Sequence, residues 1–120
     1  MLPVPYDKTS TWKKGADKGP AALIEASANM ELYDIATRSE VYRRGIHTLA
    51  PIRHAGSPDA LAGKVQTAMT RLWKAKKFPV LLGGEHSVSI GPFRAAAAAF
   101  NDLSILQLDA HADTRESYHG

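Results

Sequence analysis

The chain contains no cysteine, and this absence removes several classes of site at once. A disulfide framework, a thiolate zinc site and a cysteine nucleophile are all excluded. Basic residues are dispersed apart from short pairs such as Lys13-Lys14 and Lys76-Lys77, and the net charge is only +3. Because no basic stripe carries interleaved aromatic residues, the composition argues against nucleic acid as a partner.

Long apolar runs are also missing, so no stretch of the sequence is expected to span a membrane. The start, Met1 to Pro5, has neither the cationic nor the apolar region of a secretory signal. We therefore expect a soluble protein of the cytoplasm. The 120 residues, 44% of them hydrophobic, are the size of one small globular domain.

Helix signals are clear at two places. After a polar loop, Asp7 to Gly19, Pro20 stands where a helix favours its first residue. Ser57-Pro58-Asp59 offers an N-cap hydroxyl, a proline in the first turn and an acid facing the positive end of the helix dipole. An apolar stripe at helical spacing then follows, formed by Leu61, Val65, Met69 and Leu72.

Apolar runs predict the strands. Leu2 to Tyr6 resembles the end of a strand, although its prolines make it a poor central one. Val80 to Leu82 and Leu103 to Leu108 read as buried strands, with a helix through the alanine run Ala95 to Ala99 between them. This order predicts a right-handed βαβ unit within an α/β fold.

Two shorter segments also have strand character. Leu32 to Ile35 alternates like a strand, and Val41 to Arg43 is a further candidate.

The segment Leu108-Asp109-Ala110-His111-Ala112-Asp113 places three potential metal ligands on alternate residues. If the chain stays extended past Leu108, the side chains of Asp109, His111 and Asp113 point to one side. A lone acid or histidine at a strand end is usually a cap or turn former. Three together would be costly to desolvate without a cation between them, so the cluster favours metal ligation over coincidence.

A second motif lies upstream, where the strand Val80 to Leu82 runs through Gly83-Gly84 into Glu85 and His86. His86 alone is equally consistent with a capping histidine and with a ligand. Glu85 would point away from it in an extended segment, so we expect a structural role for Glu85. The double glycine matches neither a P-loop nor the dinucleotide fingerprint. Parallel strands that end in such groups build ligand sites at the carboxyl edge of a sheet, and we expect metal-dependent hydrolysis there.

These two motifs together resemble the ureohydrolase family of arginases, agmatinases and related amidinohydrolases. The resemblance rests on Gly83 to Ser87 followed by Asp109 to Asp113, and it extends to Pro5-Tyr6-Asp7 and to Gly15 to Pro20. Glu85 before the histidine is similar to the agmatinase branch. Arginases usually carry asparagine where Arg115 stands, which argues against arginine as the substrate.

The resemblance implies a three-layer αβα fold with a mostly parallel sheet and a binuclear manganese site. By position, His86 and Asp113 would bind one ion, His111 the other, and Asp109 would bridge both. Carboxylate and imidazole ligands without thiolate suit Mn²⁺, and two close ions can lower the pKa of a shared water toward neutrality. The implied reaction converts agmatine to putrescine and urea, in an enzyme that is a homo-oligomer when complete.

Family members are longer and carry a further Ser-x-Asp-x-Asp motif with the remaining metal ligands, which residues 1–120 lack. We therefore expect residues 1–120 to be the N-terminal part of a single ureohydrolase domain, inactive alone, with no catalytic acid or base assigned. Alternatives are a guanidinobutyrase or arginase-type enzyme, a metal-dependent deacetylase-like hydrolase, and a non-catalytic fragment. Deacetylases of that kind usually show paired histidines, whereas His111 is followed by Ala112.

Overall fold

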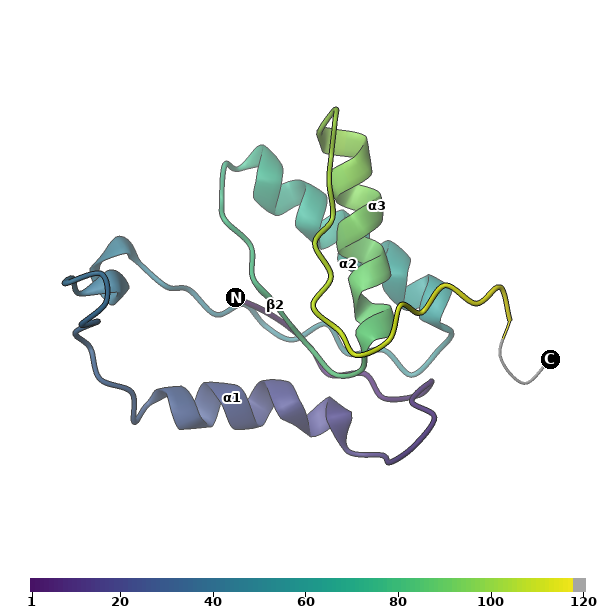
Figure 1. Cartoon of the computed structure of the whole chain (residues 1–120), viewed down its shortest axis with the longest axis horizontal. Coiled ribbons are helices and arrows are strands. Elements are labelled where there is room, and N and C mark those ends of the chain that lie inside the picture. The colour runs from purple at the N-terminus through teal and green to yellow at the C-terminus, as the bar shows by residue number, and fades with distance from the viewer. Residues whose placement is uncertain (118–120) are drawn as a thin grey trace.

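The computed structural model of the chain describes residues 1–117. Its strands and α-helices are, in chain order, β1 (Leu2–Val4), α1 (Gly19–Ser27), α2 (Pro58–Lys74), β2 (Leu81–Gly83) and α3 (Ile90–Ala99) (Figure 1). Short 3-10 helices occupy Ala16–Lys18 (η1), Val41–Arg44 (η2) and His86–Ser89 (η3). None of the helices within residues 1–117 has the length and apolar character that crossing a bilayer requires.

The two strands pair in parallel, with Leu2 opposite Leu81 and Val4 opposite Gly83. The other side of β1 is also used, because the carbonyl of Pro3 accepts from the N–H of Ile52 at 2.9 Å. Proline lacks an N–H but keeps its carbonyl, so Pro3 can accept this bond without leaving a donor unpaired. The predicted strand at Leu2 to Tyr6 is confirmed for Leu2–Val4, and that at Val80 to Leu82 is confirmed within one residue.

Helix α2 begins where the sequence predicts. The hydroxyl of Ser57 accepts from the N–H of Ala60 at 3.3 Å, and Pro58 is the first helical residue. The predicted stripe is buried at Leu61, Val65 and Met69, where it packs against the apolar side chains of the β1 segment. This contact forms the core of the molecule.

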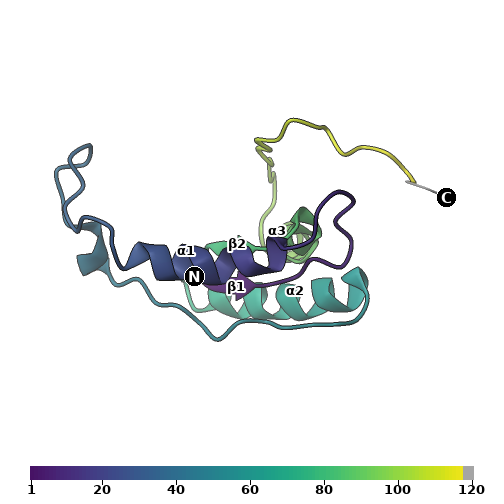
Figure 2. The same ribbon diagram turned by 90° about the horizontal axis from the view of Figure 1, so that it is seen from below.

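Helix α3 approaches α2 closely at Gly91. A Cβ atom there would lie 2.7 Å from the Cβ of Val65 and 2.8 Å from the carbonyl oxygen of Ala62, so only glycine allows this packing. Helix α1 contacts both strands from the other side. The strand pair thus lies between α1 on one side and α2 with α3 on the other (Figures 1 and 2). This layering matches the predicted αβα architecture.

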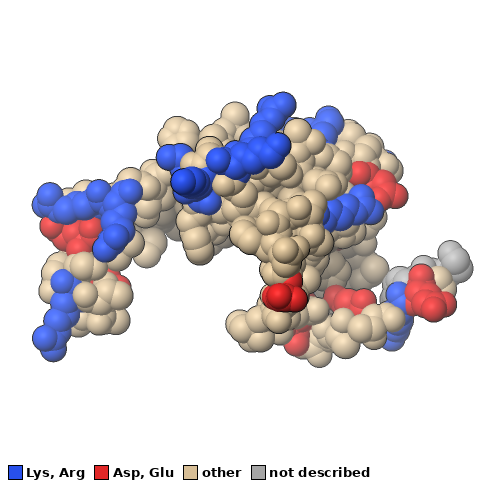
Figure 3. Space-filling model, turned by 90° about the horizontal axis from the view of Figure 1, so that it is seen from above, with Lys and Arg blue, Asp and Glu red and all other residues tan. Residues whose placement is uncertain are grey.

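The predicted strand at Leu103 to Leu108 is wrong. These residues have no regular secondary structure, and Leu106 and Leu108 are 84% and 90% exposed. Strands are stabilised by ladder hydrogen bonds and a covered face, and no strand within residues 1–117 pairs with this segment. In Figure 3 the arm that leads to the grey C-terminal residues stands off from the body.

The two weaker strand candidates are wrong as well. Leu32 to Ile35 takes part in a single isolated bridge, between Asp34 and Ser39. Val41–Arg44 forms η2, and both segments are exposed. Alternating apolar residues do not make a strand where no neighbouring strand and no core face are within reach.

Candidate metal centre

His86 is placed by the turn that follows β2. The N–H of Gly84 donates to the carbonyl of Val4 at 3.1 Å, and the N–H of Glu85 donates to that of Tyr6 at 2.9 Å. A Cβ atom on Gly84 would lie 2.0 Å from the carbonyl oxygen of Tyr6, so the double glycine lets the two backbones meet. The turn therefore extends the strand pairing up to the histidine.

Glu85 has the structural role that the sequence predicts. Its carboxylate accepts from the N–H of Ser87 at 3.1 Å and so caps η3, the short helix that carries His86. It also accepts from the hydroxyl of Thr9 at 2.6 Å, which ties the N-terminal loop to this turn. Both bonds use the Glu85 carboxylate and so fix it beside the histidine.

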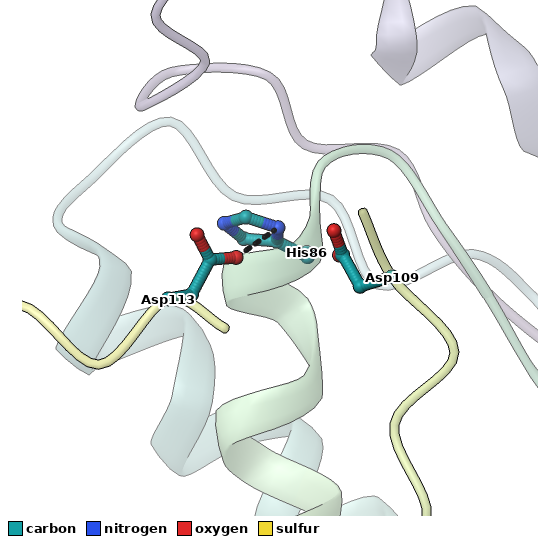
Figure 4. A group of neighbouring side chains, drawn as sticks. All are labelled: His86, Asp109 and Asp113. Atoms are coloured by element: carbon teal, nitrogen blue, oxygen red, sulfur yellow. Dashed lines mark ion pairs between the residues drawn. The ribbon is translucent and has the colours of Figure 1, made fainter. Parts of the chain in front are cut away.

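His86, Asp109 and Asp113 come together at the C-terminal end of β2 (Figure 4). One potential ligand atom from each lies within 4.8 Å of the others, and His86 Nδ1 is 3.3 Å from Asp113 Oδ2. All three side chains are partly open to solvent, with 70% of His86 and 45% of Asp113 exposed. The structure thus joins both sequence motifs.

His111 lies beside this group but outside it. Its Nδ1 is 3.8 Å from Asp109 Oδ1, and its backbone N–H donates to the same oxygen at 2.9 Å. The chain bends at residues 110 and 111 instead of continuing extended. Asp113 then adopts a left-handed conformation with φ of 51°, which turns the chain after the bend. The alternation of residues 109, 111 and 113 is therefore broken locally.

The donor set fits a divalent cation of intermediate hardness. Ligand atoms bound at about 2.0–2.6 Å from one ion can lie about 4–5 Å apart, and this group satisfies that limit. One imidazole nitrogen and two carboxylate oxygens suit manganese, and no thiolate competes for a softer metal. Three candidate ligands would leave most positions of an octahedral ion to other groups, so this group within residues 1–117 would form only part of a site.

Asp7 organises the N-terminal loop, a role that sequence reasoning missed. Its carboxylate accepts from the hydroxyl of Ser10, from the N–H of Gly15 and from the N–H of Ala16 at 3.1 Å. These hydrogen bonds, led by that from Ser10, together with nearby Lys14, hold the pKa of Asp7 below its ordinary value. The sequence feature that could have predicted this role is an acidic residue, Asp7, followed within ten residues by a hydroxyl residue and a glycine. This arrangement is typical of turns that a side chain stabilises.

The neighbouring tyrosine is buried beneath this loop. Burial raises the pKa of Tyr6, and the negative charge of Glu85 raises it further. The phenol donates to the carbonyl of Gly56 at 3.2 Å. Tyr6 therefore stays neutral and links the core to the turn that carries His86.

A hollow of about 310 Å³ lies next to the ligand group. It is lined by the loop Thr9–Lys13 and by Glu85 and His86, and we refer to it as the loop hollow. In Figure 4 the faint ribbon of the N-terminal loop passes near the labelled side chains. The sequence analysis describes residues 7–19 only as a polar loop. It missed this placement because only the folded backbone brings residue 12 near residue 86.

Comparison with known proteins points to one family. The family model described as the arginase family matches residues 1–120. The chain is 34% identical to an N(1)-aminopropylagmatine ureohydrolase of Synechocystis, over 100% of this chain and 42% of that protein. It is 35% identical to an agmatinase of Bacillus cereus, over 98% of this chain and 41% of that protein.

Solved structures give the same result. The crystal structure of agmatine ureohydrolase of Thermoplasma volcanium matches 99% of this chain and 40% of that one, with a TM-score of 0.90 and 28% identity. The arginase of Bacillus subtilis matches 82% of this chain and 32% of that one, with a TM-score of 0.62 and 26% identity. The chain therefore spans well under half the length of the proteins it matches.

Proposed function

The chain belongs to the arginase family, and from this premise we propose that it forms the N-terminal part of a manganese-dependent ureohydrolase acting on agmatine. The observation that carries the proposal is the meeting of His86, Asp109 and Asp113 at the carboxyl edge of the sheet. Open α/β sheets place their ligand sites at this edge. Relatives named agmatinase and aminopropylagmatine ureohydrolase support the same substrate class.

We assign the ligands as the resemblance to the ureohydrolase family implies. His86 and Asp113 would hold one ion, His111 the other, and Asp109 would bridge them. The 3.3 Å separation of His86 Nδ1 from Asp113 Oδ2 supports the first pair. The 3.8 Å separation of His111 Nδ1 from Asp109 Oδ1 supports these two side chains as the ones that would hold the second ion.

The reaction consumes one water and one guanidine. Agmatine and water give putrescine and urea: the bond from the guanidinium carbon to the alkylated nitrogen breaks, and the oxygen of water bonds to that carbon. Bound Mn²⁺ would supply an activated water for this step. Asp109 and Asp113 would offset part of the positive charge of the bound ions, and Glu85 holds η3 and His86 in position through its cap on Ser87.

Two features of the sequence favour agmatine over arginine as the substrate. Glu85 has the identity typical of the agmatinase branch, and Arg115 stands where arginases usually carry an asparagine. N(1)-aminopropylagmatine is a second candidate substrate, because several relatives are named for its hydrolysis. Guanidinobutyrate is a third, since Arg115 could pair with its carboxylate.

A urea-release assay on the whole gene product that contains these residues tests the proposal. The panel comprises agmatine, N(1)-aminopropylagmatine, guanidinobutyrate and arginine, each with and without Mn²⁺. We expect agmatine or its aminopropyl derivative to be preferred by at least about tenfold, which corresponds to about 1.4 kcal/mol of transition-state binding. A tenfold preference for arginine would overturn the substrate assignment, and preference for guanidinobutyrate would instead support a role for Arg115.

We also propose where the protein is located and how it assembles. We infer a cytoplasmic protein that assembles as a homo-oligomer once the remaining part of the domain is present. Four large apolar side chains of one segment are exposed together, those of Leu103, Ile105, Leu106 and Leu108, and a cluster of this kind supports a surface that other chain covers. We propose that residues 1–120 alone are inactive, since they lack enough ligands for two ions.

A further inference from the structure

We propose that Trp12 is a specificity residue that contacts the distal, cationic end of the guanidine substrate. This inference rests on the proposed function. The indole is one of the side chains that line the loop hollow together with Glu85 and His86, and it is 88% exposed. A large aromatic ring held in solvent at the mouth of a hollow beside a ligand group is available to bind a ligand.

The loop that carries Trp12 is held in shape by its own polar groups. The Lys14 ammonium donates to the carbonyls of Asp7, Lys8 and Ser10 at 2.8, 3.1 and 3.1 Å. The Asp7 carboxylate accepts from Ser10 and from the backbone at Gly15 and Ala16. Because both ends of the loop are fixed, binding a ligand at the ring requires ordering of the side chain but little ordering of the loop backbone.

The loop is also tied to the turn that carries the ligand His86. The Thr9 hydroxyl donates to Glu85 at 2.6 Å, and Glu85 caps the short helix η3 that begins with His86. The loop that carries Trp12 and the turn that carries His86 are therefore held together. A guanidine whose reacting carbon lies at the ligand group would extend its chain toward the loop.

The chemistry of the loop fits an alkyl chain that ends in an ammonium group. The indole offers an apolar surface to methylene groups, and its face attracts a cation more strongly than any other side-chain ring. Both hydroxyls that flank the start of the loop are engaged, that of Thr9 with Glu85 and that of Ser10 with Asp7. Of the other side chains that the loop contributes to the lining, Thr11 is small and Lys13 carries the same charge as the ammonium, so the indole is the loop group best suited to contact the distal amine.

The test compares steady-state kinetics of the whole gene product and three variants. Trp12→Ala removes the ring and Trp12→Phe keeps an aromatic face. Phe78→Ala removes a ring that is 93% exposed but lies outside the hollow lining, and so serves as the matched control. Substrates are agmatine and butylguanidine, which has the same four-carbon chain without the distal ammonium.

For Trp12→Ala we expect the KM for agmatine to rise roughly twofold to thirtyfold, the range set by one cation–π contact, with kcat changed less than twofold. The KM for butylguanidine should rise less, Trp12→Phe should recover most of the loss, and Phe78→Ala should match the unsubstituted protein. Melting temperatures should be equal, because both rings are exposed. An unchanged KM in Trp12→Ala, or an equal rise for both substrates, would overturn the proposal.

Failure of the proposed function would be recognised separately, as the absence of urea from every guanidine. In that event, contact between Trp12 and the guanidine is tested by the fluorescence of the Trp73→Phe variant. In this variant Trp12 is the remaining tryptophan of residues 1–120. Saturable quenching by agmatine that is clearly weaker with butylguanidine would support the contact. No change in emission across the titration would contradict it.

Discussion

Two segments flank the candidate metal centre, and they are held in different ways. The loop from Asp7 to Ala16 is closed by an internal network around one carboxylate and one ammonium. The segment from residue 103 to 113 carries two of the three grouped ligands, yet it has no strand partner within residues 1–117 and exposes its apolar side chains. One segment is organised by local polar contacts, while the other depends on neighbours.

This difference shows that a sequence predicts contacts between nearby residues more readily than contacts between residues far apart in the chain. The polar network is local, because an acid, a hydroxyl, a lysine and a glycine within ten residues satisfy one another. A buried strand is not local, because its ladder hydrogen bonds and covered face come from other strands. The apolar run at Leu103 to Leu108 has the composition of a strand, but composition alone does not order it.

The largest expected loss of stability comes from a substitution at Gly84, in the turn that follows β2. Gly84→Ala would place a Cβ atom 2.0 Å from the backbone oxygen of Tyr6, which cannot move without breaking the strand pairing. We expect loss of at least about 3 kcal/mol of folding free energy, at the upper end for overpacking against backbone. Thermal unfolding followed by circular dichroism measures it, and Gly63→Ala, where nothing lies within 4 Å, is the control. Equal melting temperatures for the two variants would contradict the packing described here.

The next effect contrasts an ordered with an unordered apolar residue. Val65→Ala removes two buried methyl groups from the core and should cost about 1–3 kcal/mol of unfolding free energy. Leu106→Ala removes a side chain that is 84% exposed and should stay within about 0.5 kcal/mol. Chemical denaturation of residues 1–120 gives both values. A larger loss for Leu106→Ala would show that the C-terminal segment packs against a partner in solution.

A pH titration tests whether the Asp7 carboxylate stabilises the loop from Asp7 to Ala16. Hydrogen bonds from Ser10 and from the backbone at Gly15, with the charge of Lys14, lower the pKa of Asp7 in the folded state. Its stabilising contribution is therefore fully present above the unfolded value of about 3.9 and is lost as pH falls through the lower folded value. Trp12 emission in a Trp73→Phe background should change over that acid range. The added substitution Asp7→Asn should remove this transition, and a transition that persists would assign it to another group.

The smallest expected effect is the change in melting temperature that Mn²⁺ causes in residues 1–120 alone. Three grouped ligands on exposed side chains gain little over the hydration shell of Mn²⁺, so the melting temperature should rise by about 2 °C or less at millimolar metal. Differential scanning calorimetry with and without Mn²⁺ measures the shift, and Asp113→Ala should abolish what remains. A shift of many degrees would mean that residues 1–120 complete the site unaided.

Much of the fold could be predicted from local signals. The Ser57-Pro58 cap, the apolar stripe through Leu61 and Val65, and the alanine run gave α2 and α3, and these helices are confirmed. The short strands followed from apolar runs next to glycine and proline. The failures at residues 32–35, 41–43 and 103–108 share one cause, because each needed a neighbouring strand that residues 1–117 do not supply.

The site was predictable in its residue types and less so in its geometry. The pairing of the His86 motif with the Asp109 to Asp113 motif was visible in the sequence, and the structure brings His86, Asp109 and Asp113 together. The bend at residues 110 and 111 was not visible, because it depends on Asp109 accepting from the N–H of His111. The loop hollow could not be predicted, since it joins residues 12 and 86 through the parallel pairing of β1 and β2.

The most direct test of the central claim measures bound manganese and urea release together in the whole gene product. Unsubstituted protein should hold about two ions per chain, the number typical of a two-metal hydrolase site, and release urea from agmatine. Asp109→Ala should lose both ions and more activity than His111→Ala, which should keep one ion, because Asp109 is assigned to bridge both. Equal metal content and equal residual activity in the two variants would contradict the bridging assignment, and urea release without any bound metal would contradict the account as a whole.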